Sequence, residues 1–275
     1  MLQLTSRFRN AYQKSILPTL HRYGYPLLSL IRRDFKTRYA PTALGLGWAV
    51  LQPLIFILLY TFVFSFILKV KFSTEDNTSD FVLYLVCGFL PFMAFSEGIQ
   101  RGSTSLTENR SLLAKVIFPA EVLPTVGVFS AAVTEIIGML LLVILAGIFG
   151  VRPSFWLLFL PFLILLRIAI TLGFAWLVSV LNVFITDIGQ FLGLLLTAWM
   201  FLTPIFYSAN LVPPDFQWLL VVNPIYQLIA AYRAIVLHTQ SPLPELIHLM
   251  PWIIIIPGFG LWFFRRTVER AKDFL

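Results

Sequence analysis

The stretch "RRDFKTRYAPTALGLGWAVLQP", residues 32–53, joins a cluster of positive charge directly to an apolar run. Its first seven residues contain four basic side chains, Arg32, Arg33, Lys36 and Arg38. Trp48 follows ten residues after Arg38 and lies in a long hydrophobic segment. Basic residues gather at the cytoplasmic ends of membrane-spanning helices, next to anionic headgroups. The stretch therefore predicts an integral membrane protein.

The composition of the 275-residue chain indicates the same class of protein. Hydrophobic residues make up 59% of it and charged residues 12%, whereas soluble domains carry about 25% charged residues. The mean hydropathy is +0.86. The net charge of +7 fits a membrane surface better than nucleic acid, because the basic residues cluster at the ends of apolar segments. We expect membrane lipids, and no nucleic acid, as partners.

Six apolar segments are long enough to cross a membrane as helices, which takes about 20 residues. They are 44–68, 81–100, 121–149, 155–184, 189–207 and 246–264. The third and fourth are long enough to tilt or to extend beyond the bilayer. The sequence predicts one all-α transmembrane domain over residues 1–275.

The distribution of Lys and Arg predicts the orientation of this domain. Fifteen of the 20 basic residues lie in the first 43 residues, the loop 101–119 and the tail after residue 264. The remaining five are Lys69, Lys71, Arg152 and Arg233 on the other side and Arg167 inside a span. The excess predicts a multi-pass protein with both termini in the cytoplasm.

Residues 24–40 predict an amphipathic helix ahead of the first span. Four apolar residues recur there at helical spacing: Leu28, Ile31, Phe35 and Tyr39. Because Arg33 and Lys36 lie on other faces, the helix should lie in the membrane interface. Pro41 would then end it and let the chain turn into the bilayer. An ordinary basic anchor is the simpler alternative.

The segment 208–244 lies outside in this topology. Its apolar pieces, 216–222 and 225–237, are too short to span and are separated by Asn223 and Pro224. We expect a re-entrant helical hairpin. Such an element needs protein or water around its exposed backbone, which suggests the mouth of a pathway. A hairpin that only caps the bundle is an equal alternative.

Motifs for catalysis and metal binding are missing from the sequence. It has no G-x-x-x-x-G-K-[ST] loop for nucleotide phosphates and no H-E-x-x-H motif. Its three histidines, His21, His238 and His248, are not grouped at metal-ligand spacing, which argues against a zinc site. We expect a protein that is not itself an enzyme and holds no metal or cofactor.

Glu135 and Arg167 are opposite charges expected at one depth in the bilayer. Each lies sixteen positions from Val151, at the turn between the third and fourth spans, so antiparallel helices bring them to the same level. Ionisable groups inside a membrane are costly unless they are paired. We predict a structural ion pair, with a substrate or proton site as the alternative.

Aromatic side chains form a second pattern. A ridge of side chains runs along the first span at four-residue steps: Trp48, Gln52, Phe56, Tyr60 and Phe64. Further aromatic residues occupy the fifth span and the predicted hairpin: Trp199, Phe206, Tyr207, Trp218 and Tyr226. Aromatic faces stack on the C–H surfaces of sugar rings, so the set is a candidate pathway. Aromatic residues that face lipid or the interface are the competing explanation.

The inner loop 101–119 is polar with an apolar centre around Leu112 and Leu113. We expect a short helix parallel to the membrane that docks a soluble partner, and a simple connector is the alternative. Just before the loop, Glu97 and Arg101 are four residues apart. A local helical ion pair is the simplest interpretation of these two charges.

Several blocks resemble the membrane subunits of type-2 ABC exporters that secrete bacterial polysaccharides. That family has an R-D-x-x-x-R-Y box followed by L-G-x-x-W-x-x-x-x-P. The matching positions here are Arg33, Asp34, Arg38 and Tyr39, then Leu46 and Gly47 (or Leu44 and Gly45), Trp48 and Pro53. Further matching blocks are 88–119, 182–207 and 221–236, so the resemblance covers nearly the whole chain in order.

The resemblance implies a homodimer in the bacterial inner membrane. Each six-helix subunit would stand on one of two separate cytoplasmic ATPase subunits, which would hold ATP and Mg²⁺. The cargo would be a lipid-linked O-antigen, capsule-type or teichoic-acid chain. The inner loop would be the coupling helix, contacting the ATPase through Glu108, Asn109, Leu112 and Lys115.

The resemblance also implies roles for the charged and aromatic sets. The first and fifth spans would line the channel, which involves Trp48, Phe56, Tyr60, Phe64, Trp199, Phe206 and Tyr207. Trp218 and Tyr226 would belong to outer gate helices. A lipid phosphate or pyrophosphate would meet the basic interface helix at Arg32, Arg33, Lys36 and Arg38. The alternatives are a type-2 exporter of a drug or small lipid and an ion-coupled transporter, which would need coupling-ion carboxylates or inverted repeats.

Overall fold

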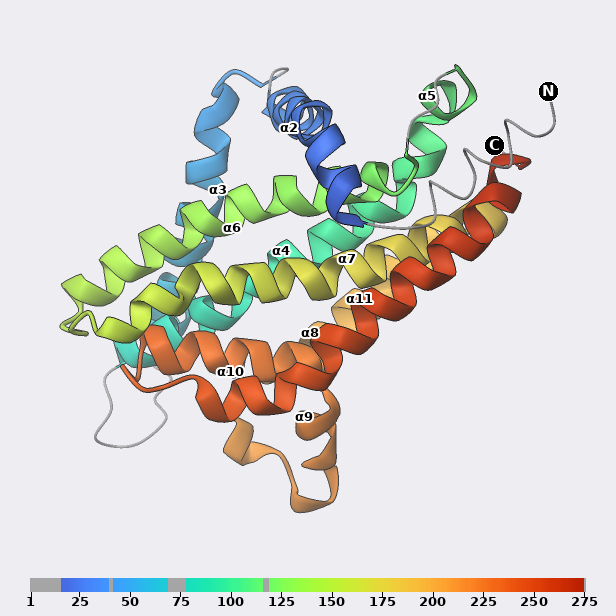
Figure 1. Ribbon diagram of the computed structural model, residues 1–275. Helices are drawn as coiled ribbons and strands as arrows, with labels where there is room; N and C mark the ends of the chain where they lie inside the picture. Colours follow the sequence, from blue (N-terminus) through green and yellow to red (C-terminus); the bar gives the residue numbers. More distant parts are fainter. Residues whose placement is uncertain (1–15, 40–41, 69–77, 116–118, 275) are drawn as a thin grey trace, which may run out of the picture.

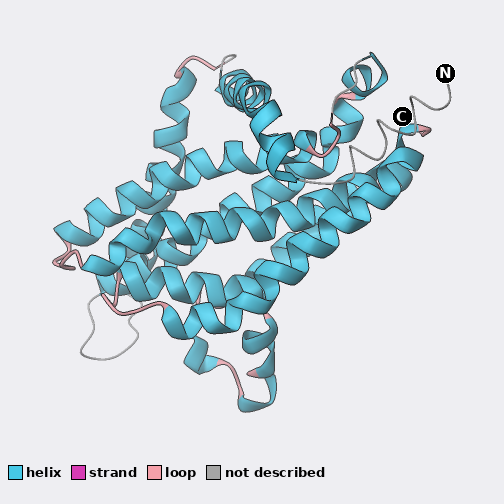
Figure 2. Cartoon of the chain, viewed as in Figure 1, coloured by secondary structure: helices cyan, strands magenta, loops and turns pink. Residues whose placement is uncertain are grey.

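A computed structural model describes residues 16–39, 42–68, 78–115 and 119–274, and within these every regular element is a helix (Figures 1 and 2). The predicted all-α class is confirmed for this part of the chain. The α-helices are α2 (Ile16–Tyr39), α3 (Trp48–Tyr60), α4 (Thr78–Glu108), α5 (Arg110–Lys115), α6 (Val122–Ile148), α7 (Leu160–Phe184), α8 (Ile188–Leu202), α9 (Trp218–Val222), α10 (Pro224–Val236) and α11 (Leu243–Lys272).

Four long helices, α4, α6, α7 and α11, form the body of the protein, and α4 is the most buried of them (Figure 1). Small residues let these helices approach closely, as is common between membrane helices. A Cβ atom on Gly102 of α4 would lie 2.6 Å from the Cβ of Ala175 on α7. A Cβ on Gly260 of α11 would lie 2.0 Å from the carbonyl oxygen of Gly173 on α7. Side chains at these glycines would therefore separate the helices.

Within the described residues, the helices long and apolar enough to cross a membrane are Phe81–Glu108, Val122–Ile148, Phe155–Phe184 and Leu243–Lys272. They correspond to the second, third, fourth and sixth predicted spans. The first and last of these four continue past the predicted ends at residues 100 and 264. The predicted ends were too early because they were placed where the apolar residues stop, whereas the backbone stays helical through the polar residues that follow.

The first and fifth predicted spans form shorter apolar helices, Trp48–Phe64 and Ile188–Leu202. Before α3, Gly45 has a φ of +50° within a turn that leads into the short 3₁₀ helix Gly45–Gly47. After α3 the backbone widens into a π-helix, Thr61–Ile67. Helix α8 ends at Leu202 because Thr203 is extended before Pro204, a residue that disfavours helix at the preceding position. A total of six spans stays a prediction.

The outer segment bends at the predicted break. Residues 214–222 and 224–236 meet at 85° on either side of Asn223. The Asn223 side-chain oxygen caps α10 by accepting hydrogen bonds from the backbone N–H groups of Ile225 (3.0 Å) and Tyr226 (3.3 Å). Pro224 occupies the first turn, where its missing N–H costs nothing. The bend fits a broken span as well as a re-entrant element, so the re-entrant hairpin stays a prediction.

One end of the bundle gathers α2, α5 and the C-terminal turns of α11 (Figure 1). At this end, α4, α6, α7 and α11 meet in an apolar end cluster. It comprises Leu106, Ala120, Leu123, Val180, Phe264, Val268 and Ala271. Leu112 and Leu113 of α5 pack against that cluster. Helix α2 covers residues 24–39 of the predicted interface helix and packs against α6, and residue 40 lies outside the described residues. The short helix α5 therefore packs against an apolar cluster to which α4, α6, α7 and α11 all contribute residues.

Candidate functional site

Helix α3 turns its aromatic ridge toward α4 and toward the turn after α8. The Phe89 ring of α4 lies 5.3 Å from the Phe56 ring and 5.0 Å from the Tyr60 ring, both edge-to-face and measured between centroids. The Phe206 ring lies 6.3 Å from Tyr60 and 6.4 Å from Phe89. Phe64 follows Tyr60 at 6.2 Å. We call Phe56, Tyr60, Phe64, Phe89 and Phe206 the aromatic track.

The aromatic track is a surface as well as a packing element. Phe56, Tyr60, Phe64 and Phe206 are only partly buried, so their rings keep exposed area. Trp48, at the start of α3, is also partly buried. Sequence reasoning missed Phe89, because spacing along α3 says nothing about which of the many phenylalanines on α4 faces it.

Trp199 has a different environment from the aromatic track. Its ring packs edge-to-face between Phe95 of α4 and Phe174 of α7, each 5.4 Å away. Its indole N–H donates a hydrogen bond to Asn223 Oδ1 at 3.1 Å. Trp199 therefore supports the bend between α9 and α10 from inside the bundle. These contacts do not test the expectation that Trp199 lines the channel, which stays a prediction.

Tyr207 lies beside the aromatic track and is held by the backbone. Its hydroxyl donates to the carbonyl of Phe201 at 2.9 Å, and the Tyr84 hydroxyl donates to the carbonyl of Tyr207 at 3.4 Å. In the outer segment, Trp218 is exposed and Tyr226 is partly buried. The hydrogen bonds of Tyr207 tie the turn after α8 to α8 and α4. The expected outer gate residues lie elsewhere, Trp218 at the start of α9 and Tyr226 in α10.

A network of four charged side chains joins α2 to α4. Arg38 donates to the Glu97 carboxylate, and Arg101 donates to the Asp34 carboxylate. Arg101 Nη1 also lies 3.5 Å from Glu97 Oε1. The local pair between Glu97 and Arg101 is thus one link of a larger set, and the simplest interpretation was incomplete. The pairs Arg38–Glu97 and Asp34–Arg101 join residues 59 and 67 positions apart, so spacing within one helix could not predict them.

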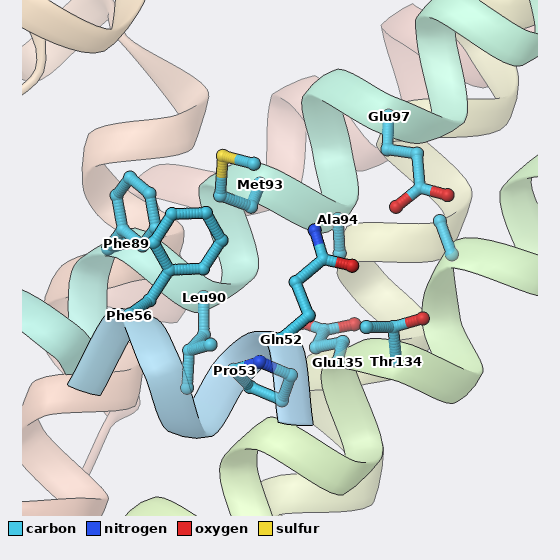
Figure 3. Close-up of a pocket in the computed structure, with 11 residues that line it drawn as sticks. Gln52, Pro53, Phe56, Phe89, Leu90, Met93, Ala94, Glu97, Thr134 and Glu135 are labelled. Carbon is cyan, nitrogen blue, oxygen red and sulfur yellow. The ribbon is translucent and has the colours of Figure 1, made fainter. Parts of the chain in front are cut away.

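Two cavities adjoin this charged network. The larger, about 400 Å³, is lined by Arg38, Gln52, Met93, Ser96, Glu97, Gln100 and Arg101. The smaller, about 30 Å³, shares Gln52, Met93 and Glu97 with it and continues to Phe56 and Phe89 (Figure 3). In Figure 3, Gln52 of α3 and Glu97 of α4 reach into the same space. The polar cavity therefore leads directly to the aromatic track.

The four basic residues between 32 and 38 of α2 fall into two groups. Arg32, Arg33 and Lys36 are exposed on the helix surface. Arg38 is partly buried and paired with Glu97. The first group is therefore available to an anion at the membrane surface. The second belongs to the wall of the polar cavity.

Glu135 and Arg167 meet in the middle of the bundle, with side chains that are 0% exposed. Arg167 Nε donates to Glu135 Oε2 at 2.9 Å, and Nη2 lies 2.7 Å from the same oxygen. The Tyr232 hydroxyl donates to the other oxygen, Oε1, at 2.9 Å. Thr171 adds a contact to Arg167 Nη1 at 3.4 Å. The Glu135 carboxylate of α6 is therefore bound by side chains from α7 and α10. The contact with Tyr232 was not predicted from the sequence.

Arg233 is a second buried cation, although the charge count had placed it in an outer loop. Its guanidinium donates to the carbonyls of Tyr84 (3.2 Å), Pro204 (2.8 Å) and Ile205 (3.4 Å). It also lies 3.3 Å from the centroid of the Tyr84 ring. Carbonyl oxygens and an aromatic face, both uncharged, satisfy this cation. The residue holds α10 and the turn after α8 against α4.

The expected ATPase contacts lie at the corner between α4 and α5. Glu108, the last residue of α4, is exposed. Asn109 separates the helices, and its side chain donates to the carbonyl of Ser105 at 2.9 Å. Leu112 is partly buried against the apolar end cluster. Lys115 ends α5, and its side chain lies outside the described residues.

Comparison with known proteins places these features in a family. Residues 25–237 match the family described as "ABC-2 type transporter". The chain belongs to the ABC-2 type transporter family. This stretch contains the charged network, both cavities and the aromatic track. Membership makes the chain a membrane subunit of a transporter rather than an enzyme, as the sequence predicted.

Three relatives cover most of this chain. An O-antigen export system permease protein RfbA from Myxococcus xanthus is 29% identical over 81% of this chain and 84% of its own length. A protein of the same name from Klebsiella pneumoniae is 26% identical over 92% and 96%. The polysialic acid transport protein KpsM from Escherichia coli is 23% identical over 76% and 80%. These names confirm the predicted likeness to polysaccharide export permeases.

Proposed function

We propose that this chain is the membrane subunit of an ATP-driven exporter of a lipid-linked polysaccharide. The observation that carries the proposal is similarity over most of the chain to relatives named for O-antigen and polysialic acid transport. The aromatic track supports it, because a row of partly exposed rings suits the C–H faces of sugars. The cargo class comprises O-antigen, capsule-type and teichoic-acid chains.

The direction of transport is from the cytoplasm outward. The end that gathers α2, α5 and the last turns of α11 is the cytoplasmic end, because the basic residues concentrate there. The proposal puts both termini in the cytoplasm of a bacterium, at its inner membrane. The segment of α9 and α10 then forms the outer gate, with Trp218 and Tyr226.

Energy comes from a separate partner. Two copies of a cytoplasmic ATPase hold ATP and Mg²⁺ and dock at the corner between α4 and α5, through Glu108, Asn109, Leu112 and Lys115 of each subunit. A movement of α5 reaches the bundle through the apolar end cluster against which Leu112 packs. Two copies of this chain form the channel, with Trp48 on α3, Trp199 on α8, and Phe206 and Tyr207 in the turn after α8 nearest to it.

The exposed cations of α2 receive the lipid headgroup. Arg32, Arg33 and Lys36 present positive charge at the cytoplasmic surface, which suits a phosphate or pyrophosphate. Arg38 contributes less because Glu97 already neutralises it. The polymer enters behind the headgroup and follows α3 outward.

Deletion of the gene and a tagged copy test this function together. Loss of polymer from the cell surface, with accumulation of lipid-linked polymer inside, is the expected result of deletion. The tagged chain should co-purify in mild detergent with an ATPase in a two-plus-two complex. Normal surface polymer in the deletion strain would redirect the proposal to a drug or small-lipid exporter. Repeated purification of a folded chain without any ATPase would favour the ion-coupled alternative.

A further inference from the structure

We infer that the polar cavity between α2, α3 and α4 binds an uncharged, hydroxyl-rich saccharide unit and delivers it to the aromatic track. This inference rests on the proposed function and adds to it a specific site within one subunit. The cavity volume, about 400 Å³, falls within the range of about 300–1,000 Å³ that small-molecule sites occupy. The site is distinct from the exposed cations of α2.

The charge balance of the cavity favours a neutral ligand. Its two cations, Arg38 and Arg101, are both engaged by carboxylates, those of Glu97 and Asp34. The network therefore has no net charge. A phosphate placed there would have to displace a carboxylate from an arginine. A neutral hydroxyl group accepts from the guanidinium groups and donates to the carboxylates without breaking either pair.

The remaining polar groups suit hydroxyl groups as well. Gln52 and Gln100 each carry one acceptor and a two-hydrogen donor, and Ser96 adds a hydroxyl that both donates and accepts. Gln100 Nε2 lies 3.4 Å from Ser96 Oγ, a long contact that a ligand can replace. Sugar hydroxyl groups also donate and accept, so the lining matches a saccharide in both respects.

The cavity continues into an apolar surface of the right kind. Gln52, Met93 and Glu97 line both cavities, and the smaller one reaches the rings of Phe56 and Phe89 (Figure 3). A saccharide unit held by its hydroxyl groups at the polar end can therefore place its C–H face on an aromatic ring at the next step. A sugar ring has hydroxyl groups at its edge and C–H groups on its face, so it fits a site where polar side chains lie beside an aromatic ring.

Photo-crosslinking tests the site in the complete complex with its ATPase. Gln100 is exposed and is replaced with p-benzoylphenylalanine, and the complex receives radiolabelled lipid-linked polysaccharide extracted from the producing strain. We expect a labelled adduct that excess delipidated polysaccharide reduces at least tenfold. Inorganic pyrophosphate at the same concentration should leave the adduct unchanged. The Gln52→Leu substitution should reduce the adduct at least fivefold.

Other outcomes overturn the inference. Competition by pyrophosphate instead of polysaccharide would assign the cavity to the lipid headgroup. Failure of Gln52→Leu to reduce the adduct would remove the cavity from the binding site. The same crosslinker at Tyr60 separates this inference from the proposed function. An adduct at Tyr60 without one at Gln100 would refute the cavity site alone, whereas adducts at neither position, with normal export by a strain lacking the gene, would refute the function itself.

Export in living cells provides a second test with a matched control. Gln52→Leu and Gln100→Leu keep side chains of similar size but remove the hydrogen-bonding groups, so surface polymer should fall several-fold. Gln240→Leu makes the same change at an exposed position outside the cavity and should leave export unchanged. Co-purification of the ATPase with each variant shows that the complex is assembled. Normal export by the assembled Gln52→Leu/Gln100→Leu double variant would overturn the inference.

Discussion

Two groups of charged side chains in this protein occupy opposite environments. Glu135 and Arg167 have 0% side-chain exposure and are closed off further by the Tyr232 hydroxyl. The network of Asp34, Arg38, Glu97 and Arg101 is between 21% and 27% exposed and borders a cavity of about 400 Å³. Both contain the same carboxylate and guanidinium groups. Glu135 borders only the smaller cavity, of about 30 Å³. Side-chain exposure and the size of the adjoining cavity, more than residue type, therefore separate a structural ion pair from a candidate binding site.

The largest expected effect comes from breaking the buried pair. Glu135→Ala strands the Arg167 guanidinium away from water and should lower the free energy of unfolding by about 3–5 kcal/mol. Thermal unfolding of the purified complex in detergent measures it. Glu135→Gln keeps an acceptor for Tyr232 and should cost less. A neutral Glu135→Ala variant, together with a worse Glu135→Ala/Arg167→Ala variant, would show that the pair is not structural.

Arg233 sharpens the comparison because uncharged groups satisfy its charge. Arg233→Met removes hydrogen bonds to three carbonyls but leaves no opposite charge behind. We expect a loss of about 1–3 kcal/mol in unfolding free energy. Arg167→Met should cost more, because Glu135 then remains buried alone. Equal melting temperatures for the two variants would contradict the distinction between the two kinds of buried cation.

The partly exposed network should affect transport more than stability. Glu97→Gln removes the charge that links Arg38 to Arg101 and should change the free energy of unfolding by about 0.2–1 kcal/mol. Surface polymer should nevertheless fall several-fold, because the cavity wall loses its charge balance. Glu269→Gln breaks an exposed pair with Lys272 and serves as the control, with normal export expected. A large stability loss with unchanged export would reverse the assignment.

Salt gives the smallest expected effect. Raising ionic strength from about 0.1 M to 1 M shortens the Debye length from about 10 Å to about 3 Å. The stability difference between the unmodified chain and Glu97→Gln should therefore shrink by half or more. The difference for Glu135→Gln should stay constant, because no solvent reaches that pair. Equal salt sensitivity of the two differences, measured by thermal unfolding, would place both groups in the same environment.

Much of the fold could be predicted because lipid imposes a simple rule. A segment that crosses hydrocarbon must be apolar over about 20 residues, and segments such as 121–149 and 155–184 meet that rule in the sequence itself. The symmetric spacing of Glu135 and Arg167 about Val151 likewise depends only on two antiparallel helices. The π-helix after α3 was not predicted, because it depends on local backbone geometry within an apolar segment. The early end of α8 was not predicted either, although Pro204 marks it in the sequence.

Less of the candidate site could be predicted. Four-residue spacing identified the ridge of α3 but not Phe89, its partner on α4. Membership of the fifth predicted span grouped Trp199 with Phe206, although Trp199 packs between Phe95 and Phe174 inside the bundle. Spacing within one helix defines a face, whereas the rotation and depth of the neighbouring helix determine what that face contacts.

The sequence by itself determined the class of protein, the four long spans, the concentration of positive charge at one end and the likeness to a transporter family. These features follow from composition and from the order of residues along the chain, because the bilayer requires apolar spans of about 20 residues and favours positive charge on the cytoplasmic side. Only the tertiary structure decided that Glu97 pairs with Arg38, that Tyr232 completes the buried pair and that Arg233 lies in the core. Such contacts join residues tens of positions apart, and they exist only once helix packing has set their distances.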